Sequence, residues 1–217
     1  MSDAVLGLPA MVRWLELFQT KIAAAREWLT ELDSAIGDAD HGANMDRGMN
    51  AVVAKLSGGP AASFAELFKN VGMTLVSSVG GASGPLYGTF FMRFGMEAGA
   101  VAQVDAAGLG GALRAGLGGI VARGKAEVGD KTMVDAMTPA LDAYDAALAV
   151  GQAPPGAVQA ALAAAVAGRD ATIPLVARKG RASYLGERSA GHMDPGSAST
   201  VLLFEALAEA VESDSTE

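Results

Sequence analysis

Residues 12–32, VRWLELFQTKIAAAREWLTEL, contain apolar side chains that recur every three or four positions. This spacing places them along one face of an α-helix, whereas a strand would need alternation with a period of two. The segment therefore predicts a long first helix with one buried face. The positions on that face are Val12, Leu15, Phe18, Ile22, Ala25, Leu29 and Leu32.

The same period continues along the chain and predicts seven more helices. They cover about residues 40–56, 63–79, 86–100, 105–123, 132–150, 154–178 and 197–211. Asp40 and Ser63 are suitable N-caps for the first two of these helices. We find no alternating run that would predict a sheet. Short connections favour an all-α fold, an eight-helix antiparallel up-and-down bundle formed by a single domain over residues 1–211. The acidic tail 212–217 is expected to be frayed.

Composition narrows the class of protein. Hydrophobic residues make up 51% of the chain but aromatic residues only 6%, so alanine and glycine supply much of the core and allow helices to approach closely. The net charge of −8 argues against a nucleic-acid partner. The absence of cysteine excludes disulfides and thiolate metal sites and fits a cytoplasmic protein. We identify no signal peptide. Gly-Pro and Pro-Pro breaks interrupt the two uncharged stretches, so no membrane partner is expected.

Three carboxylates lie close together in residues 32–45, LDSAIGDADHGANM, at Asp33, Asp38 and Asp40. They would repel one another without a cation between them, and Mg²⁺ and Ca²⁺ prefer oxygen ligands of this kind. Residues 41–44 resemble the first turn of a helix, whose free N–H groups attract anions. The sequence therefore predicts a metal–phosphate site, with solvated loop aspartates and a simple N-cap as the alternative.

Other familiar motifs do not fit. An EF-hand loop beginning at Asp38 would need a glutamate where Met49 stands. Residues 119–126, GIVARGKA, resemble a phosphate-binding P-loop but lack its terminal Ser or Thr and follow a helix. His41 and His192 have neither cysteine partners nor the spacing of a zinc site.

The order of the helices brings the candidate segments to one end of an alternating bundle. The connections after the first, third, fifth and seventh helices contain the aspartates, the glycine-rich residues 80–85, the turn 124–131 and the long loop 179–196. That loop carries Arg181 and Arg188, and long ordered loops are often functional. We therefore expect a single composite site.

Four of these segments, residues 33–45, 81–88, 129–133 and 180–196, resemble in sequence and order the signatures of the nucleotide-binding L subunits of dihydroxyacetone kinase. The resemblance implies an eight-helix antiparallel barrel with the nucleotide at one end, in agreement with the helical pattern. It implies that three aspartates hold two Mg²⁺ ions, namely Asp33, Asp38 and Asp40. It implies that ADP or ATP contacts His41, Gly42, Ala43, Asn44, Ala82, Ser83, Gly124, Met133, Arg181, Asp194 and Pro195. It assigns no catalytic side chain to this chain.

The resemblance also implies a division of labour. A partner K subunit binds dihydroxyacetone, and the L subunit supplies the phosphoryl donor through Mg²⁺ and nucleotide. In one type, bound ADP is phosphorylated by a phosphohistidine M subunit of a phosphotransferase system; in the other, ATP enters and ADP leaves. A kinase module for another small substrate and a nucleotide-binding regulatory protein remain alternatives. A homodimer is also left open.

Overall fold

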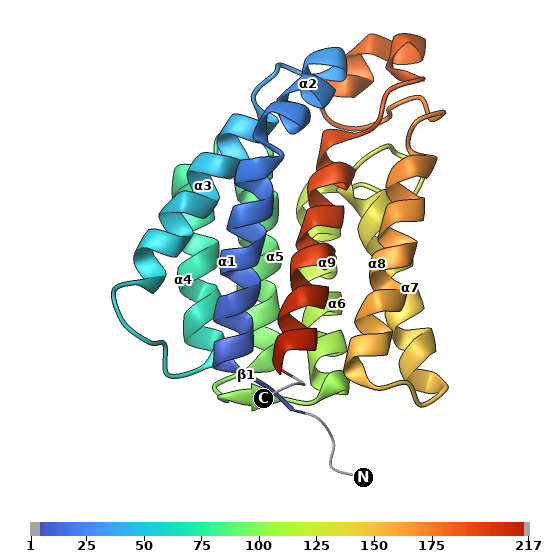
Figure 1. The fold of residues 1–217 in the computed structure, drawn as a ribbon. Coiled ribbons are helices and arrows are strands. Elements are labelled where there is room, and N and C mark those ends of the chain that lie inside the picture. The colour runs from blue at the N-terminus through green and yellow to red at the C-terminus, as the bar shows by residue number, and fades with distance from the viewer. Residues whose placement is uncertain (1–4, 215–217) are drawn as a thin grey trace.

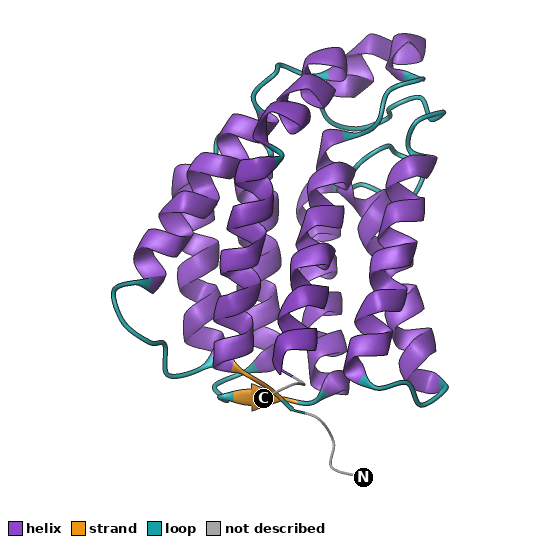
Figure 2. Cartoon of the chain, in the orientation of Figure 1, coloured by secondary structure: helices purple, strands orange, loops and turns teal. Residues whose placement is uncertain are grey.

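The computed structural model describes residues 5–214, and the regular structure in this part of the chain is almost entirely helical (Figure 2). This confirms the all-α class. The helices are α1 (Leu8–Ala24), α2 (Arg26–Ile36), α3 (His41–Leu56), α4 (Phe64–Ser78), α5 (Ser83–Ala98), α6 (Ala106–Gly124), α7 (Met133–Ala149), α8 (Pro154–Ala171), the 3-10 segment η1 (Arg181–Ser189) and α9 (Pro195–Asp214).

Within residues 5–214, eight long helices stand side by side and form a ring. Each of α1, α3, α4, α5, α6, α7, α8 and α9 packs on the next, and α9 packs back on α1 (Figure 1). The two remaining helical elements, α2 and η1, contact each other and lie across the upper end of the ring in Figure 1. The start of α1 and the end of α9 lie at the opposite end.

The long first helix of the prediction is divided in two. It breaks at Ala25, which has φ −93° and ψ 5°, and α2 then leans over the end of the ring. There Ile36 packs with Ala177 and Ala182 in a small apolar cluster separate from the main core. Ala25 is a strong helix former and the apolar spacing runs straight through it, so the break comes from this tertiary packing and has no local sequence signal.

The main core is built around Trp14, which is fully buried. Its indole ring lies 5.7 Å from the ring of Phe91 and 5.6 Å from that of Phe94, and its Nε1–H donates to the Leu203 carbonyl at 2.9 Å. This bond ties α1 to α9 where the ring closes. Elsewhere glycine permits close approach, as expected: a Cβ at Gly72 on α4 would lie 2.6 Å from a carbonyl oxygen of α5.

Three details differ from the prediction. A two-residue antiparallel ladder pairs β1 (Leu6–Gly7) with β2 (Gln103–Val104), and strands this short cannot show an alternating pattern. Helix α8 ends at Ala171, seven residues early, and Pro174 is the signal for that end because the residue before proline avoids helical geometry. Helix α9 extends to Asp214, so the expected frayed tail is helical at its start; residues 215–217 lie outside the described part.

None of the helices formed by residues 5–214 is long and apolar enough to cross a membrane.

Candidate functional site

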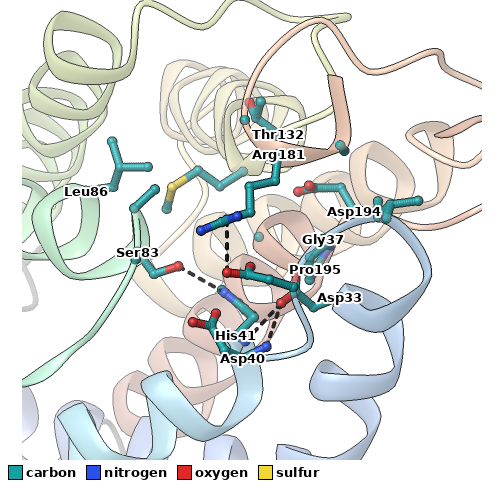
Figure 3. Close-up of a pocket in the computed structure, with 18 of the residues that line it drawn as sticks. Asp33, Gly37, Asp40, His41, Ser83, Leu86, Thr132, Arg181, Asp194 and Pro195 are labelled. Carbon is teal, nitrogen blue, oxygen red and sulfur yellow. Dashed lines mark hydrogen bonds and ion pairs between the residues drawn. The ribbon is translucent and has the colours of Figure 1, made fainter. Parts of the chain in front are cut away.

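A pocket with a volume of about 190 Å³ opens at the end of the ring that α2 and η1 cover (Figure 3). Its walls come from five separate segments. They are residues 33–41, 80–87, 131–133, 179–182 and 194–196. The connections that the sequence assigned to one end of the bundle therefore do line one pocket, although only the last residue of the turn 124–131 reaches it.

The three aspartates converge at one wall of this pocket. Asp33, Asp38 and Asp40 each offer a carboxylate oxygen, and these oxygens all lie within 4.8 Å of one another. Ala39, between the last two, has φ +61°, a left-handed conformation that L-residues rarely adopt and that turns the chain sharply here. The donor set, three carboxylates of graded exposure at a pocket wall, fits a hard divalent cation.

Asp33 differs from its two neighbours because it also supports the fold. It lies in the last turn of α2, is 8% exposed, and its Oδ2 accepts the backbone N–H groups of Asp40 at 2.8 Å and His41 at 3.1 Å. Asp40 occupies the predicted N-cap position of α3, but its own side chain makes no capping hydrogen bond. The carboxylate of Asp33 therefore fills part of the helix start that the sequence assigned to an external anion.

The side chain of Asn44, one turn into α3, is fixed by Arg47 and by the glycine-rich segment. Arg47 donates from Nη2 to Asn44 Oδ1 at 2.6 Å and from Nε to the Ser78 carbonyl at 2.9 Å. The Asn44 amide packs against Gly80, where a Cβ would lie 2.9 Å from Asn44 Oδ1. Gly81 follows with φ +64°, which explains the glycine there. These contacts bring the glycine-rich segment beside the aspartates.

His41 is buried in a hydrogen-bond network beneath the pocket. Its Nδ1 lies 3.0 Å from Ser83 Oγ and its Nε2 lies 3.0 Å from Ser199 Oγ. Ser199 donates to the Gly196 carbonyl at 3.0 Å, so it accepts from both His41 Nε2 and the Tyr87 hydroxyl, 2.8 Å away.

Burial lowers the pKa of His41 to about 4 against the opposing charges of Asp33 and Asp40, so the ring is neutral near pH 7. With Nε2 protonated, Nδ1 accepts from Ser83. Both ring nitrogens are engaged, which argues against His41 as a nucleophile. Burial likewise raises the pKa of Tyr87 to about 12.

Lys131 organises the opposite wall of the pocket. Only 1% exposed, it donates from Nζ to the carbonyls of Thr172 at 2.8 Å and Leu175 at 3.1 Å, and it also contacts the carbonyls of Ile173 and His192. These bonds tie the end of α8 and the loop before α9 to the start of α7. Burial lowers the pKa of Lys131, while the neighbouring carboxylates oppose that change.

Asp194 caps α9 beside this lysine. Its Oδ2 accepts the Ser197 N–H at 2.6 Å, and its own N–H donates to Thr172 Oγ1 at 3.1 Å. Burial raises the pKa of Asp194 to about 7, although the bond from Ser197 works in the other direction. The pocket lining includes four acidic side chains and three basic ones, Lys131, Lys179 and Arg181.

Arg181 reaches across the pocket toward the aspartates in Figure 3. Its Nε lies 2.9 Å from Asp38 Oδ2. Among the described residues, no other basic side chain forms an ion pair with Asp33, Asp38 or Asp40. The Arg181 side chain is 67% exposed and the Asp38 side chain 38% exposed, so the contact is open to solvent.

Some of the residues expected to contact the nucleotide line the pocket and others do not. His41, Ala82, Ser83, Met133, Arg181, Asp194 and Pro195 line the pocket, as do the three aspartates. Gly42, Ala43, Asn44 and Gly124 lie outside the lining, as does Arg188. Gly42 also allows α2 to approach α3, since a Cβ there would overlap the Arg26 carbonyl oxygen. Roles for all of these residues remain predictions.

Tyr87, Lys131 and Thr132 are among the lining residues that the sequence did not single out as site residues. All three fall inside segments that it had singled out, so proximity to those segments was the available signal. Nothing in the sequence indicates that Lys131 is buried, because an isolated lysine in a polar turn is usually solvated.

Comparison with known proteins gives consistent matches. The model of the DAK2 domain matches residues 35–209. The PEP-dependent dihydroxyacetone kinase ADP-binding subunit DhaL of Escherichia coli is 45% identical over 203 residues, which cover 94% of this chain and 97% of that protein. The PTS-dependent counterpart of Lactococcus lactis is 44% identical over 95% of this chain and its whole length.

A solved structure agrees with these matches. It is the dihydroxyacetone kinase of C. freundii in complex with AMP-PNP and Mg²⁺, with a TM-score of 0.70 and 31% identity. The alignment covers 96% of this chain but 35% of that longer chain, so this chain corresponds to about a third of it.

Proposed function

This chain belongs to the DAK2 domain family, and on that basis we propose that it is the nucleotide-binding subunit of a dihydroxyacetone kinase. In this role it holds ADP with two Mg²⁺ ions and passes a phosphoryl group to dihydroxyacetone bound on a K subunit. The observation that carries the proposal is the convergence of three carboxylates within 4.8 Å in a pocket that also presents Arg181. Relatives of nearly the same length named as ADP-binding subunits support the cofactor.

Charge explains why metal and nucleotide must bind together. A diphosphate entering this pocket meets three clustered carboxylates and Asp194, which is partly protonated near pH 7, beside three basic side chains, so the local field does not favour an anion by itself. Divalent cations on Asp33, Asp38 and Asp40 would reverse the sign at that wall. Nucleotide retention should therefore depend on Mg²⁺.

The residues of the chain would each perform a positioning task. The aspartates would anchor the metal, Ser83 at the start of α5 would contact the phosphates, and Met133 would offer an apolar surface. Asn44, which lies outside the pocket lining, would support the glycine-rich segment at Gly80. When bound, the metal–nucleotide supplies the phosphoryl donor and neutralises charge as the group moves. The pocket volume of about 190 Å³ is below the roughly 300–1,000 Å³ of enclosed ligand sites, so part of the nucleotide would extend outside the pocket.

Partner subunits complete the proposed reaction. The acceptor hydroxyl belongs to dihydroxyacetone on the K subunit, and the phosphoryl group comes from a phosphohistidine on an M subunit of a phosphotransferase system. Names of relatives that specify PEP or PTS dependence favour this route over exchange of free ATP. We propose that this complex acts in the cytoplasm.

Mass analysis of nucleotide released from the purified protein tests the proposal. We expect ADP in near-unit amount when Mg²⁺ is kept present, and its loss after EDTA treatment. Transfer to dihydroxyacetone should then require added K subunit and phosphorylated M subunit. A site that exchanges ATP freely and phosphorylates dihydroxyacetone without M would contradict the ADP-cofactor mechanism.

Two variants supply the matched comparison. Asp38→Ala should abolish Mg²⁺-dependent ADP retention while leaving the helical circular dichroism unchanged. Asp142→Ala removes an exposed carboxylate that pairs with Arg114 away from the pocket, and it should retain ADP like the wild-type protein. Full retention by folded Asp38→Ala would rule out the metal site.

A further inference from the structure

The ion pair between Arg181 and Asp38 joins a residue expected to bind nucleotide with one expected to bind metal. Arg181 Nε approaches Asp38 Oδ2 at 2.9 Å, and the same carboxylate contributes to the three-oxygen cluster. A carboxylate oxygen that accepts a charge-assisted hydrogen bond from a guanidinium has its charge partly neutralised and its lone pairs directed away from other cations. Arg181 and a metal ion therefore compete for Asp38.

We propose that Arg181 is a built-in counter-ion of the aspartate cluster, which a divalent cation displaces from Asp38 and which then turns to the phosphates of the nucleotide. The inference rests on the proposed function, since it needs both ligands to bind here. It adds a sequence of events within the site: metal binding releases the arginine that the nucleotide uses.

The backbone around Arg181 favours exchange by side-chain rotation alone. Ala182, the next residue, is 9% exposed and packs with Ile36 of α2, close to the aspartates. The main chain of η1 is thus held against α2 at this point, while the Arg181 side chain is 67% exposed. A long side chain on a fixed backbone can move between two anionic partners without rearranging the fold.

Charge favours the Arg181–Asp38 pair in the metal-free site and favours its replacement once a divalent cation binds. With no divalent cation, three carboxylates within 4.8 Å need a counter-charge, and Arg181 supplies it. A divalent ion contributes twice the charge of a guanidinium and can contact several of the oxygens together, so it outcompetes the arginine. A diphosphate then offers the guanidinium a bidentate anionic partner.

The exchange predicts that Arg181→Gln changes the affinities for metal and for nucleotide in opposite directions. Exposed ion pairs contribute about 0.2–1 kcal/mol, which converts to a roughly 1.5- to 5-fold change in affinity. In nucleotide-free protein, we expect Arg181→Gln to bind Mn²⁺, detected by electron paramagnetic resonance, more tightly than wild type by about that factor. With Mg²⁺ present, the same variant should bind ADP more weakly in calorimetry. A general loss of site structure would weaken both.

Arg188→Gln is the matched control, because Arg188 is an exposed arginine of the same η1 segment and lies outside the pocket lining. It should leave both affinities unchanged. Since removing any nearby positive charge could favour a cation, the effect is repeated in the Asp38→Asn background. The amide oxygen introduced by Asp38→Asn keeps a weaker Mn²⁺ affinity that can be measured, but the shared carboxylate is gone, so Arg181→Gln should no longer tighten Mn²⁺ binding. An equal gain in that background would overturn the exchange.

A direct reading comes from the Arg181 Nε–H resonance in ¹H–¹⁵N spectra of the nucleotide-free protein. Mg²⁺ alone should shift this signal with the same midpoint as metal binding, and the Arg188 signal should stay in place. If wild-type protein binds Mn²⁺ and ADP but Arg181→Gln binds Mn²⁺ no more tightly, the inference fails and the proposed function stands. If wild-type protein binds neither ligand, both fail.

Discussion

The carboxylate of Asp33 caps the helix that begins at His41, with Oδ2 accepting the His41 N–H at 3.1 Å and the Asp40 N–H at 2.8 Å. One predicted metal ligand therefore also supports the fold, whereas Asp38 lies in the exposed loop that follows α2. We expect Asp33→Ala to lower the free energy of unfolding by about 1 kcal/mol, as the loss of an N-cap does, and to abolish metal binding. Urea unfolding and Mn²⁺ titration measure the two effects.

Two companion variants separate these roles. Asp38→Ala should lose metal binding at nearly unchanged stability. Asp33→Asn keeps an acceptor oxygen for the two N–H groups, so it should fold almost as stably as wild type but bind metal more weakly. Equal stability of Asp33→Ala and Asp38→Ala would show that the capping bonds contribute nothing measurable.

Asp33 illustrates which features of the site could be predicted from the sequence and which could not. The cluster of Asp33, Asp38 and Asp40 could be predicted because carboxylates close together in the sequence repel one another in any fold. The shared end of the bundle followed from counting helices. The burial of Asp33, and its use as the cap in place of Asp40, depends on the break at Ala25, which no local preference encodes.

Lys131 and Gly42 illustrate the same limit. The burial of Lys131 depends on four carbonyls from residues more than 40 positions later in the chain. The packing role of Gly42 depends on how closely α2 crosses α3, which no local pattern indicates, and its expected nucleotide contact stays a prediction. Local periodicity determines the helices well, but the contacts that set the pocket are long-range.

Gly42 sets the distance between α2, which carries Asp33, and α3, which follows Asp38 and Asp40. A Cβ there would overlap the Arg26 carbonyl oxygen and lie 2.5 Å from Thr30 Oγ1, both on α2. Gly42→Ala should push α2 away from α3, lower stability by about 1–3 kcal/mol as overpacking does, and weaken Mg²⁺-dependent ADP retention. Thermal unfolding and calorimetry are the measurements.

Gly118→Ala is the control for this substitution. Gly118 also lies inside a helix, α6, but a Cβ built there has nothing within 4 Å. Because alanine is the better helix former, this variant should be unchanged or more stable by up to about 1 kcal/mol, with normal ADP retention. Similar behaviour of the two alanine variants would contradict the packing role of Gly42.

Lys131 and Lys125 form a natural pair, because both have a left-handed backbone, with φ +64° and +53°, but only Lys131 is buried. Lys131→Met would leave the carbonyls of Thr172, Leu175 and His192 without their ammonium partner. We expect a loss of about 2–4 kcal/mol in the free energy of unfolding, since buried acceptors that lose a charged donor are costly.

Lys125→Met makes the same chemical change on the surface and should shift stability by less than about 0.5 kcal/mol. Hydrogen exchange should locate the effect of Lys131→Met in residues 172–175 and in the loop before α9. If both methionine variants unfold at the same urea concentration as wild type, the bonds from Lys131 to the backbone carbonyls do not stabilise the fold.

Asp194 should make stability depend on pH in the ligand-free protein. Burial raises its pKa from 3.8 to about 7, so the folded state holds the proton more firmly than the unfolded chain does. The resulting stabilisation is complete below about pH 4 and is lost as the pH rises to 7. The difference between the two pKa values corresponds to at most about 4 kcal/mol.

Asp194→Asn removes this titration but keeps an acceptor for the Ser197 N–H. Chemical unfolding of both proteins between pH 4 and 8, without Mg²⁺ or nucleotide, should show wild type losing stability relative to the variant up to pH 7 and running parallel to it above. Asp142→Asn, at an exposed carboxylate, should follow wild type throughout. Parallel curves for wild type and Asp194→Asn from pH 4 upward would mean that Asp194 ionises equally easily in the folded and unfolded states.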